Sequence, residues 1–194
     1  MGLAGVTTLL IRLPYRPPVQ NAIYTGVLLL SAYAYLRFRC GLIPPLVVVF
    51  CLALSVATDV FGNAFELYGT RVGPIEFDDL AHVVTAGLTL PAVMWLLDEV
   101  TRLRRQTVSV PLLAALSTTA TFSLSAYYEI VELWDELFLG GERLWGARDT
   151  PADLQWNLLG IVLAALVSAP VFVRARARRK PATRPSASES PDRG

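Results

Sequence analysis

The sequence is poor in charge and in the residues that usually build metal or disulfide sites. Only 17% of its 194 residues are charged, whereas soluble domains carry about 25%. It contains one histidine and two cysteines, Cys40 and Cys51, which fit neither a disulfide framework nor a zinc motif. Low charge, 54% hydrophobic residues and a mean hydropathy of +0.48 predict a protein whose solvent is lipid.

Several functional motifs are also missing. The chain has no glycine-rich phosphate loop, no Gly-x-Ser-x-Gly nucleophile motif and no His-Glu-x-x-His pair. No basic face is interleaved with aromatic residues, so we expect no nucleic-acid partner. Residues 1–13 are apolar, but no Lys or Arg precedes them, so they do not match a signal peptide.

Five apolar segments are long enough to cross about 30 Å of hydrocarbon as helices. Their short connections predict an all-α, polytopic membrane helix bundle in which neighbouring helices are antiparallel. A short interfacial lead-in (residues 1–19) precedes the membrane domain (20–174), and a basic, then disordered, tail (175–194) follows it. The predicted spans are residues 21–38, 42–65, 80–97, 108–133 and 154–173.

Lysine and arginine are distributed unevenly between the two ends of this bundle. One end holds 12 of them, including Arg102, Arg104, Arg105 and the run at residues 174–180, and the other end holds 5. Because basic residues favour the cytoplasmic side, we expect the N-terminus outside and the C-terminus inside a bacterial plasma membrane. The basic run is then expected to contact anionic lipids of the inner leaflet.

This topology gathers acidic residues at the outer end, where the second and fourth spans finish and the third and fifth begin. Asp78 and Asp79 precede His82, the only histidine, by four and three residues, so either carboxylate can reach the imidazole. Glu129 and Glu132 end the fourth span, and charge at the edge of the membrane calls for a reason. The sequence therefore predicts one shared site at the outer face.

Other polar residues accompany this group. Asp59, Asn63 and Glu66 share one face of the second span, and Asp59 is deep enough that it should face the bundle interior. We interpret the polar stripe of the fourth span either as close helix packing or as a water-accessible groove. That stripe consists of Ser117, Thr121 and Ser125, and it ends at Glu129.

The start of the fifth span carries a helix-capping pattern. Thr150 is predicted as the N-cap and Asp153 as its partner at the third helical position. Asp149 and Asn157 extend the polar group, and Gly160 permits close helix approach on the face of Asp153.

Crowded carboxylates at a membrane interface need a bound cation, partial protonation or pairing with arginine. Oxygen ligands with one imidazole suit Mg²⁺, Mn²⁺, Zn²⁺ or Fe²⁺, so one divalent metal ion is the candidate cofactor. Helix capping is a competing use for Asp78 or Asp79. The candidate catalytic residues are His82, Asp79 and Glu129, and the candidate metal ligands are Asp78, Asp79, His82, Glu129, Glu132 and Asp153.

Three functions fit these residues, and the sequence leaves open whether the protein is an enzyme. In the first interpretation the site acts on lipid-linked or cell-envelope substrates, with His82 as general base or metal ligand. Alternatively, Asp59 and the fourth-span stripe serve a proton- or ion-coupled transporter. In the third interpretation the protein is structural, and its acids cap and pair helix ends.

Three motifs of the chain can be compared with known families: Phe77-Asp78-Asp79-Leu80-Ala81-His82, Tyr128-Glu129-x-x-Glu132 and Asp149-Thr150-x-x-Asp153-x-x-x-Asn157-x-x-Gly160. Over residues 59–173 they resemble the YjdF-like family of bacterial inner-membrane proteins of unknown function. More distantly, they are similar to the VanZ-like family, which is associated with glycopeptide resistance. VanZ-like proteins tend to have Asp-Lys-x-x-His where this chain has Asp-Asp-Leu-Ala-His, which weakens any inherited phosphate-binding role. The resemblance implies a polytopic bundle with an acidic and histidine signature.

Overall fold

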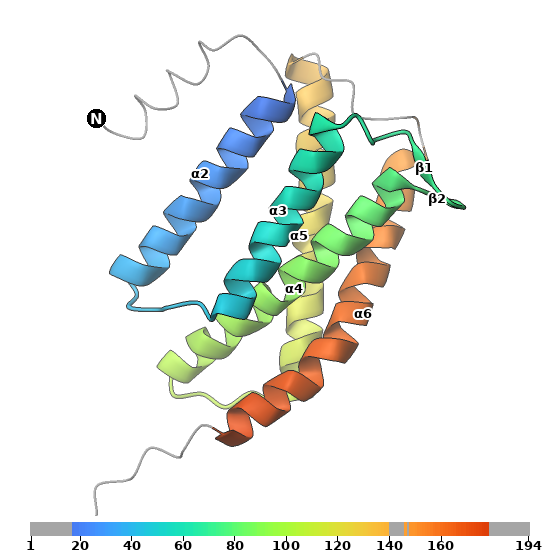
Figure 1. The fold of residues 1–194 in the computed structure, drawn as a ribbon. Helices are drawn as coiled ribbons and strands as arrows, with labels where there is room; N and C mark the ends of the chain where they lie inside the picture. Colours follow the sequence, from blue (N-terminus) through green and yellow to red (C-terminus); the bar gives the residue numbers. More distant parts are fainter. Residues whose placement is uncertain (1–16, 140–145, 147, 179–194) are drawn as a thin grey trace, which may run out of the picture.

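The computed structural model describes residues 17–139, 146 and 148–178 (Figure 1). Most of the predicted lead-in and of the predicted tail therefore lies outside the described residues. Helices make up most of the described chain, and the two short strands form no sheet core, which confirms the all-α prediction. They are α2 (Pro17–Phe38), α3 (Leu46–Ala64), α4 (Phe77–Leu103), α5 (Val110–Leu139) and α6 (Asp149–Arg178).

Four of these helices, α3 to α6, are long and apolar enough to cross a membrane. The remaining helix, α2, has 22 residues, which corresponds to a length of about 33 Å. Its described apolar part is Gly26–Phe38. The predicted polytopic bundle is confirmed, with helix ends shifted by several residues. α3 begins at Leu46 and not at residue 42, because Pro44 and Pro45 precede it. Proline is accommodated just before a helix or in its first turn but not in its interior.

α4 is the central helix of the bundle. It packs against α3, α5 and α6, whereas α2 packs along α3 (Figure 1). The backbones of α4 and α6 approach most closely at two glycines: a Cβ atom on Gly160 would lie 2.1 Å from the carbonyl oxygen of Val83, and one on Gly87 would lie 3.1 Å from the carbonyl oxygen of Gly160. The close approach predicted at Gly160 is confirmed, and it belongs to the small-residue packing common between membrane helices.

The interior between α4, α5 and α6 is apolar in the middle of the bundle. Leu90, Met94, Leu113 and Ile161 are fully buried there and form one cluster. α3 is attached to α4 by the Ser55 hydroxyl, which donates to the Thr85 carbonyl oxygen at 3.2 Å. This core separates two polar ends of the bundle.

A short hairpin that the sequence did not predict connects α3 to α4. Its strands are β1 (Arg71–Val72) and β2 (Ile75–Glu76), paired antiparallel. Gly73 adopts a positive φ of 69° in the turn, where a residue without a side chain is favoured. The Phe77 N–H donates to the Thr70 carbonyl oxygen at 2.9 Å, so the hairpin fixes the place where α4 begins.

The end where α4 finishes holds two buried carboxylates, each with an arginine. Arg176 of α6 donates its Nε to Asp98 Oδ1 at 3.0 Å and also binds the Val108 carbonyl oxygen. Arg102 donates to Glu99 at 2.6 Å. The basic run at residues 174–180 was predicted to contact lipid, but Arg176 within it is bound to the protein itself, and α6 remains helical to Arg178.

Candidate metal centre

The site begins at the N-terminus of α4, where two acidic neighbours take different roles. Glu76 occupies the N-cap position, and its backbone N–H donates to Asp79 Oδ2 at 3.4 Å. Asp79 therefore caps the helix, which confirms one of the two uses predicted for this pair. Asp78 remains available to the imidazole one turn further along the helix.

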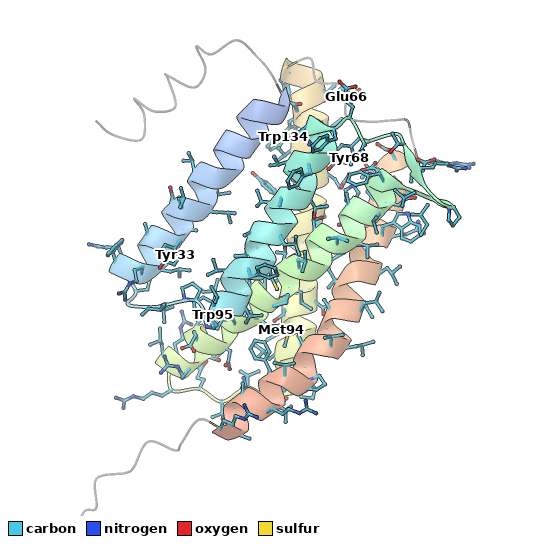
Figure 2. All side chains as sticks on the ribbon, in the orientation of Figure 1. Tyr33, Glu66, Tyr68, Met94, Trp95 and Trp134 are labelled. Carbon is cyan, nitrogen blue, oxygen red and sulfur yellow. The ribbon has the colours of Figure 1, made fainter. Side chains whose placement is uncertain are left out.

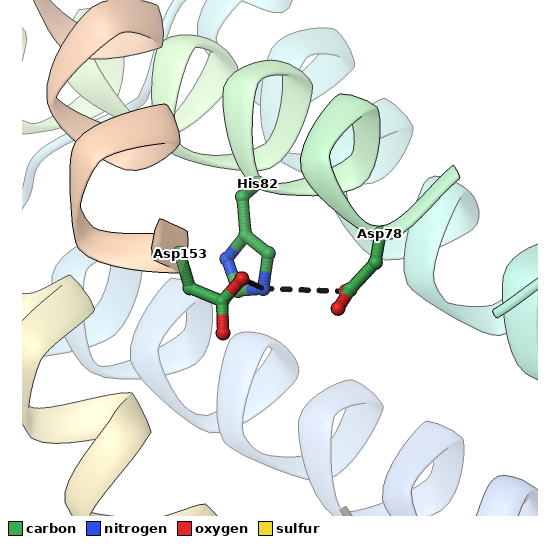
Figure 3. A group of neighbouring side chains, drawn as sticks. All are labelled: Asp78, His82 and Asp153. Carbon is green, nitrogen blue, oxygen red and sulfur yellow. Dashed lines mark ion pairs between the residues drawn. The ribbon is translucent and has the colours of Figure 1, made fainter. Parts of the chain in front are cut away.

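Two carboxylates converge on one nitrogen of His82. Asp78 Oδ1 lies 3.4 Å from Nε2, and Asp153 Oδ1 of α6 lies 3.5 Å from the same nitrogen (Figure 3). One ligand atom from each of the three residues fits within a group whose members all lie within 4.8 Å of one another. Residues 71 positions apart in the sequence, on helices α4 and α6, thus form one cluster, as the topology predicted.

A third carboxylate faces the other nitrogen of the ring. Glu129 Oε1 of α5 lies 4.0 Å from His82 Nδ1. The Glu129 side chain is only 2% exposed, and the Thr150 hydroxyl lies near it. Neither of its oxygens accepts a hydrogen bond of ordinary geometry from any residue that the structure describes. A buried carboxylate without such a partner is unusual, because leaving it unsatisfied costs about 1–3 kcal/mol or more.

The exposed fraction of the side chains increases across the cluster from the bundle interior to its edge. The side chains of Glu129 and Asp153 are 2% and 6% exposed, those of His82 and Asp78 13% and 22%. Among the described residues, His82 is the one ion-pair partner of these three carboxylates. The open side of the cluster is therefore the side of Asp78, toward the hairpin.

The α4–α6 crossing is what brings the cluster together. Val83, which packs against Gly160, is the residue after His82. Asp153 and Asn157 precede Gly160 by two turns and one turn on the same face, and both are buried. A side chain at position 160 would force the two helices apart and separate the imidazole from Asp153.

The other predicted site residues lie around this cluster or beside it. Asp59 accepts hydrogen bonds from the Asn63 amide and the Tyr68 hydroxyl, both at 3.0 Å. Glu66 is exposed just beyond the end of α3 (Figure 2), in the left-handed region with φ 53°. Glu132 and Asp149 are near enough to Asp153 to interact with it electrostatically.

Tyr68 is a site residue that the sequence did not single out: it donates to Asp59 and packs against Phe77, the residue before Asp78. Its ring packs edge-on against Phe77 and over Gly62, where a Cβ atom would lie 2.6 Å from the Phe77 ring. Burial and then the Asp59 carboxylate raise the pKa of Tyr68 far above its ordinary value, and Tyr128 and Asp78 add to this effect. The phenol thus remains a hydrogen-bond donor to Asp59 at physiological pH. No spacing rule in the sequence points to this residue.

The capping pattern predicted on α6 is wrong by two residues, because the helix starts earlier than expected. The helix begins at Asp149, so Thr150 lies within the first turn and does not precede it. The Asp149 N–H donates to the Gly146 carbonyl oxygen at 3.1 Å, and the Ala152 N–H to the Arg148 carbonyl oxygen at 3.1 Å. Thr150 and Asp153 are consequently free to face the interior, Thr150 toward Glu129 and Asp153 toward His82.

The separations between these atoms suit a small cation. A tetrahedral ion with ligand bonds of about 2.1 Å holds its ligand atoms about 3.4 Å apart. The distances from His82 Nε2 to Asp78 and Asp153 are 3.4 and 3.5 Å. Two of the three donor separations therefore match such an ion, and the third, between Asp78 and Asp153, is within 4.8 Å.

Comparison with known proteins gives one result. A profile of the family described as "Predicted membrane protein (DUF2238)" matches residues 2–177. The chain belongs to this family. Membership is consistent with the YjdF-like resemblance and supports a multi-pass membrane protein, while the relation to the VanZ-like family stays a prediction. No curated protein and no solved structure matches the chain.

Proposed function

We propose that this membrane protein binds one divalent metal ion between Asp78, His82 and Asp153, and that the metal centre acts on a lipid-linked or cell-envelope substrate. The observation that carries the proposal is the convergence of three donor atoms within 4.8 Å of one another beside a buried Glu129 whose oxygens accept no ordinary hydrogen bond.

The charge of the cluster supports a cation. Asp78, Glu129 and Asp153 bring three carboxylates, and among the described residues their one ionic partner is His82. Even a protonated imidazole compensates only one of them. Buried charges that lack compensation cost several kcal/mol each, about the same order as the total stability of a domain. A divalent ion removes most of this excess negative charge.

The number of donors supports chemistry at the metal. Three protein ligands leave one position of a tetrahedral ion free, which is typical of catalytic zinc sites, whereas structural sites are closed. A bound metal supplies Lewis acidity to an oxygen that occupies this position. Asp78, the most exposed of the three ligands, marks the side from which a headgroup oxygen would reach it. Asp79 contributes by capping α4 and thereby holding Asp78 and His82 in place.

The middle of the bundle argues against an ion path. The polar stripe of α5 runs inward from Glu129 through Ser125 and Thr121 to Ser117. Beyond Ser117, the apolar core fills the space between α4, α5 and α6. A site open to one face accounts for this arrangement better than a continuous transport route does.

Arginine placement supports an outward-facing metal centre in a bacterial plasma membrane. Most described arginines lie at the opposite end, after α2, after α4 and at the end of α6. Basic residues favour the cytoplasmic side, so the C-terminus is inside and the metal centre outside. Exposed Arg37, Arg39, Arg104 and Arg105 then meet anionic inner-leaflet lipids. Activity of a periplasmic reporter fused to the C-terminus, in place of activity of a cytoplasmic one, would reverse this orientation.

Metal analysis of purified protein tests the proposal. The protein is purified with a histidine-free affinity tag, loaded with Zn²⁺, Mn²⁺ or Fe²⁺, and dialysed before elemental analysis. We expect one ion per chain in the wild type, and none in His82→Ala or Asp153→Asn. Asp135→Asn, which removes a carboxylate from α5 at the same end of the bundle, is the matched control and should retain the ion. A folded wild-type protein that retains none of the three metals would exclude the metal centre.

A further inference from the structure

We infer that Glu129 is not a ligand of the proposed ion but the positioning residue that orients His82 toward it. This inference rests on the proposed metal centre and assigns the two imidazole nitrogens different tasks: Nε2 binds the ion, and Nδ1–H donates toward Glu129. Glu129 is thereby removed from the set of ligands that the sequence pattern predicts.

The carboxylates approach the imidazole ring from different directions. Asp78 and Asp153 both lie beside Nε2, at 3.4 and 3.5 Å, whereas Glu129 Oε1 lies beside Nδ1 at 4.0 Å. The lone pairs of the two ring nitrogens point to different sides of the ring, so an ion bonded to Nε2 lies away from Nδ1. An ion between Asp78, His82 and Asp153 is consequently on the side of the imidazole that Glu129 does not face.

The Glu129 carboxylate is buried and lacks an ordinary hydrogen-bond partner within the part of the chain that the structure describes. Its side chain is 98% buried, and neither oxygen accepts an ordinary hydrogen bond from the described residues. Within the described part of the chain, its ion-pair partner is the imidazole, at 4.0 Å. A metal on Nε2 makes Nδ1–H a stronger donor, and a carboxylate on that side raises the basicity of the ligand in return. The buried charge and the metal thus stabilise each other through the ring.

The assignment has a consequence for substrate. With Glu129 outside the coordination sphere, Asp78, His82 and Asp153 are the three protein ligands and one position stays open. The open position lies toward the edge of the membrane, where Asp78 is partly exposed. The substrate class that fits is an ester or phosphoester at headgroup level, bound to the ion through one oxygen.

The single histidine makes the assignment directly measurable. Labelling the chain with ¹⁵N-histidine gives imidazole signals from His82 alone when the tag contains no histidine. In the zinc-loaded protein we expect a proton on Nδ1 and metal-shifted resonance at Nε2. A proton on Nε2 with metal at Nδ1 would overturn the inference while leaving metal binding itself intact.

Zinc affinity separates a positioning residue from a ligand. In Glu129→Gln we expect one Zn²⁺ per chain still to bind, with an affinity about 10–100-fold lower. Asp78→Asn should lose more, because a ligand is removed. Glu136→Gln makes the same chemical change two turns further along α5 and should match the wild type.

The failures of the two proposals are distinguishable. Absence of zinc from the folded wild type overturns the metal centre. If zinc binds to the wild type but Glu129→Gln loses it as completely as Asp78→Asn does, Glu129 is a ligand and the inference is wrong. If Glu129→Gln keeps wild-type affinity and an unchanged Nδ1 resonance, Glu129 has no role in orienting the ring, and the inference is again wrong.

Discussion

The two ends of the bundle bury acidic side chains in different company. At the end where α4 finishes, Asp98 is bound by Arg176 and Glu99 by Arg102. At the end where α4 begins, Asp78, Glu129 and Asp153 surround one imidazole, and no arginine or lysine pairs with them within the described part of the chain.

The difference indicates at which end the chain itself supplies the positive charge that its buried carboxylates need. The Asp98–Arg176 pair joins the end of α4 to the end of α6 with opposite charges and direct hydrogen bonds. The His82 cluster joins the other ends of the same helices with an excess of negative charge. We interpret the first as a structural lock and the second as an arrangement that is fully stabilised when a cation binds.

The largest effect is expected where α4 and α6 cross between the two ends. In Gly160→Ala, the added Cβ would lie 2.1 Å from the Val83 carbonyl oxygen, and backbone atoms have little freedom to move. We expect a loss of about 3 kcal/mol or more in the free energy of unfolding, together with loss of zinc binding. Unfolding in mixed detergent micelles and zinc titration measure the two effects.

Gly26→Ala is the matched control for this change. Nothing lies within 4 Å of a Cβ atom at Gly26, so the gain in helix propensity, about 1 kcal/mol at most, should appear unopposed. Equal stability changes in the two variants would contradict the close crossing of α4 and α6.

The next largest effect should come from the paired end. Asp98→Asn removes the charge that Arg176 binds, and breaking a buried pair costs about 3–5 kcal/mol. Because the Arg176 side chain is 27% exposed, we expect the lower part of this range. A double-mutant cycle with Arg176→Gln isolates the pair. A coupling energy near zero would mean that Arg176 faces lipid, as the sequence analysis expected for the whole basic run.

Neutralising Glu129 at the other end should change the free energy of unfolding in the opposite direction when metal is absent. In metal-free protein we expect Glu129→Gln to stabilise the fold by about 1 kcal/mol, because a buried charge without an ordinary hydrogen bond becomes neutral. With zinc present, the wild type should regain the advantage, since a ligand at 100 times its Kd adds about 2.7 kcal/mol. Thermal unfolding with chelator and with zinc checks this reversal. Destabilisation by Glu129→Gln in both conditions would remove the contrast between the two ends.

The sequence predicted the helices and the meeting of His82, Glu129 and Asp153 because both follow from simple rules. Apolar length gives the spans, and alternating direction gives the end at which each carboxylate lies. Gly160 also behaved as its residue type predicts, since the absence of a side chain is what lets α6 approach Val83.

What the sequence did not predict depends on rotation and on long-range partners. Helical spacing allows either Asp78 or Asp79 to reach His82, and only the hairpin that fixes Glu76 as N-cap assigns Asp79 to capping. The pairing of Asp98 with Arg176 spans 78 positions and obeys no periodicity. Which imidazole nitrogen each carboxylate faces is likewise set by the rotation of α5 and α6, which an apolar pattern determines only loosely.

The smallest effect tests whether the two ends are independent of the middle of the bundle. Ser55 of α3 donates to the Thr85 carbonyl oxygen of α4, between the polar ends. Interhelical hydrogen bonds in membranes contribute about 0.6 kcal/mol on average, so Ser55→Ala should lower the free energy of unfolding by about this amount. Thr58→Ala removes a hydroxyl that donates to the Leu54 carbonyl oxygen within α3, so it is the matched control and should change the free energy of unfolding less. Zinc affinity and the Asp98–Arg176 coupling should be unchanged in both variants. If Ser55→Ala weakened zinc binding, then α3 would also help to position His82. The metal centre would then depend on α3 as well as on the α4–α6 crossing and α5.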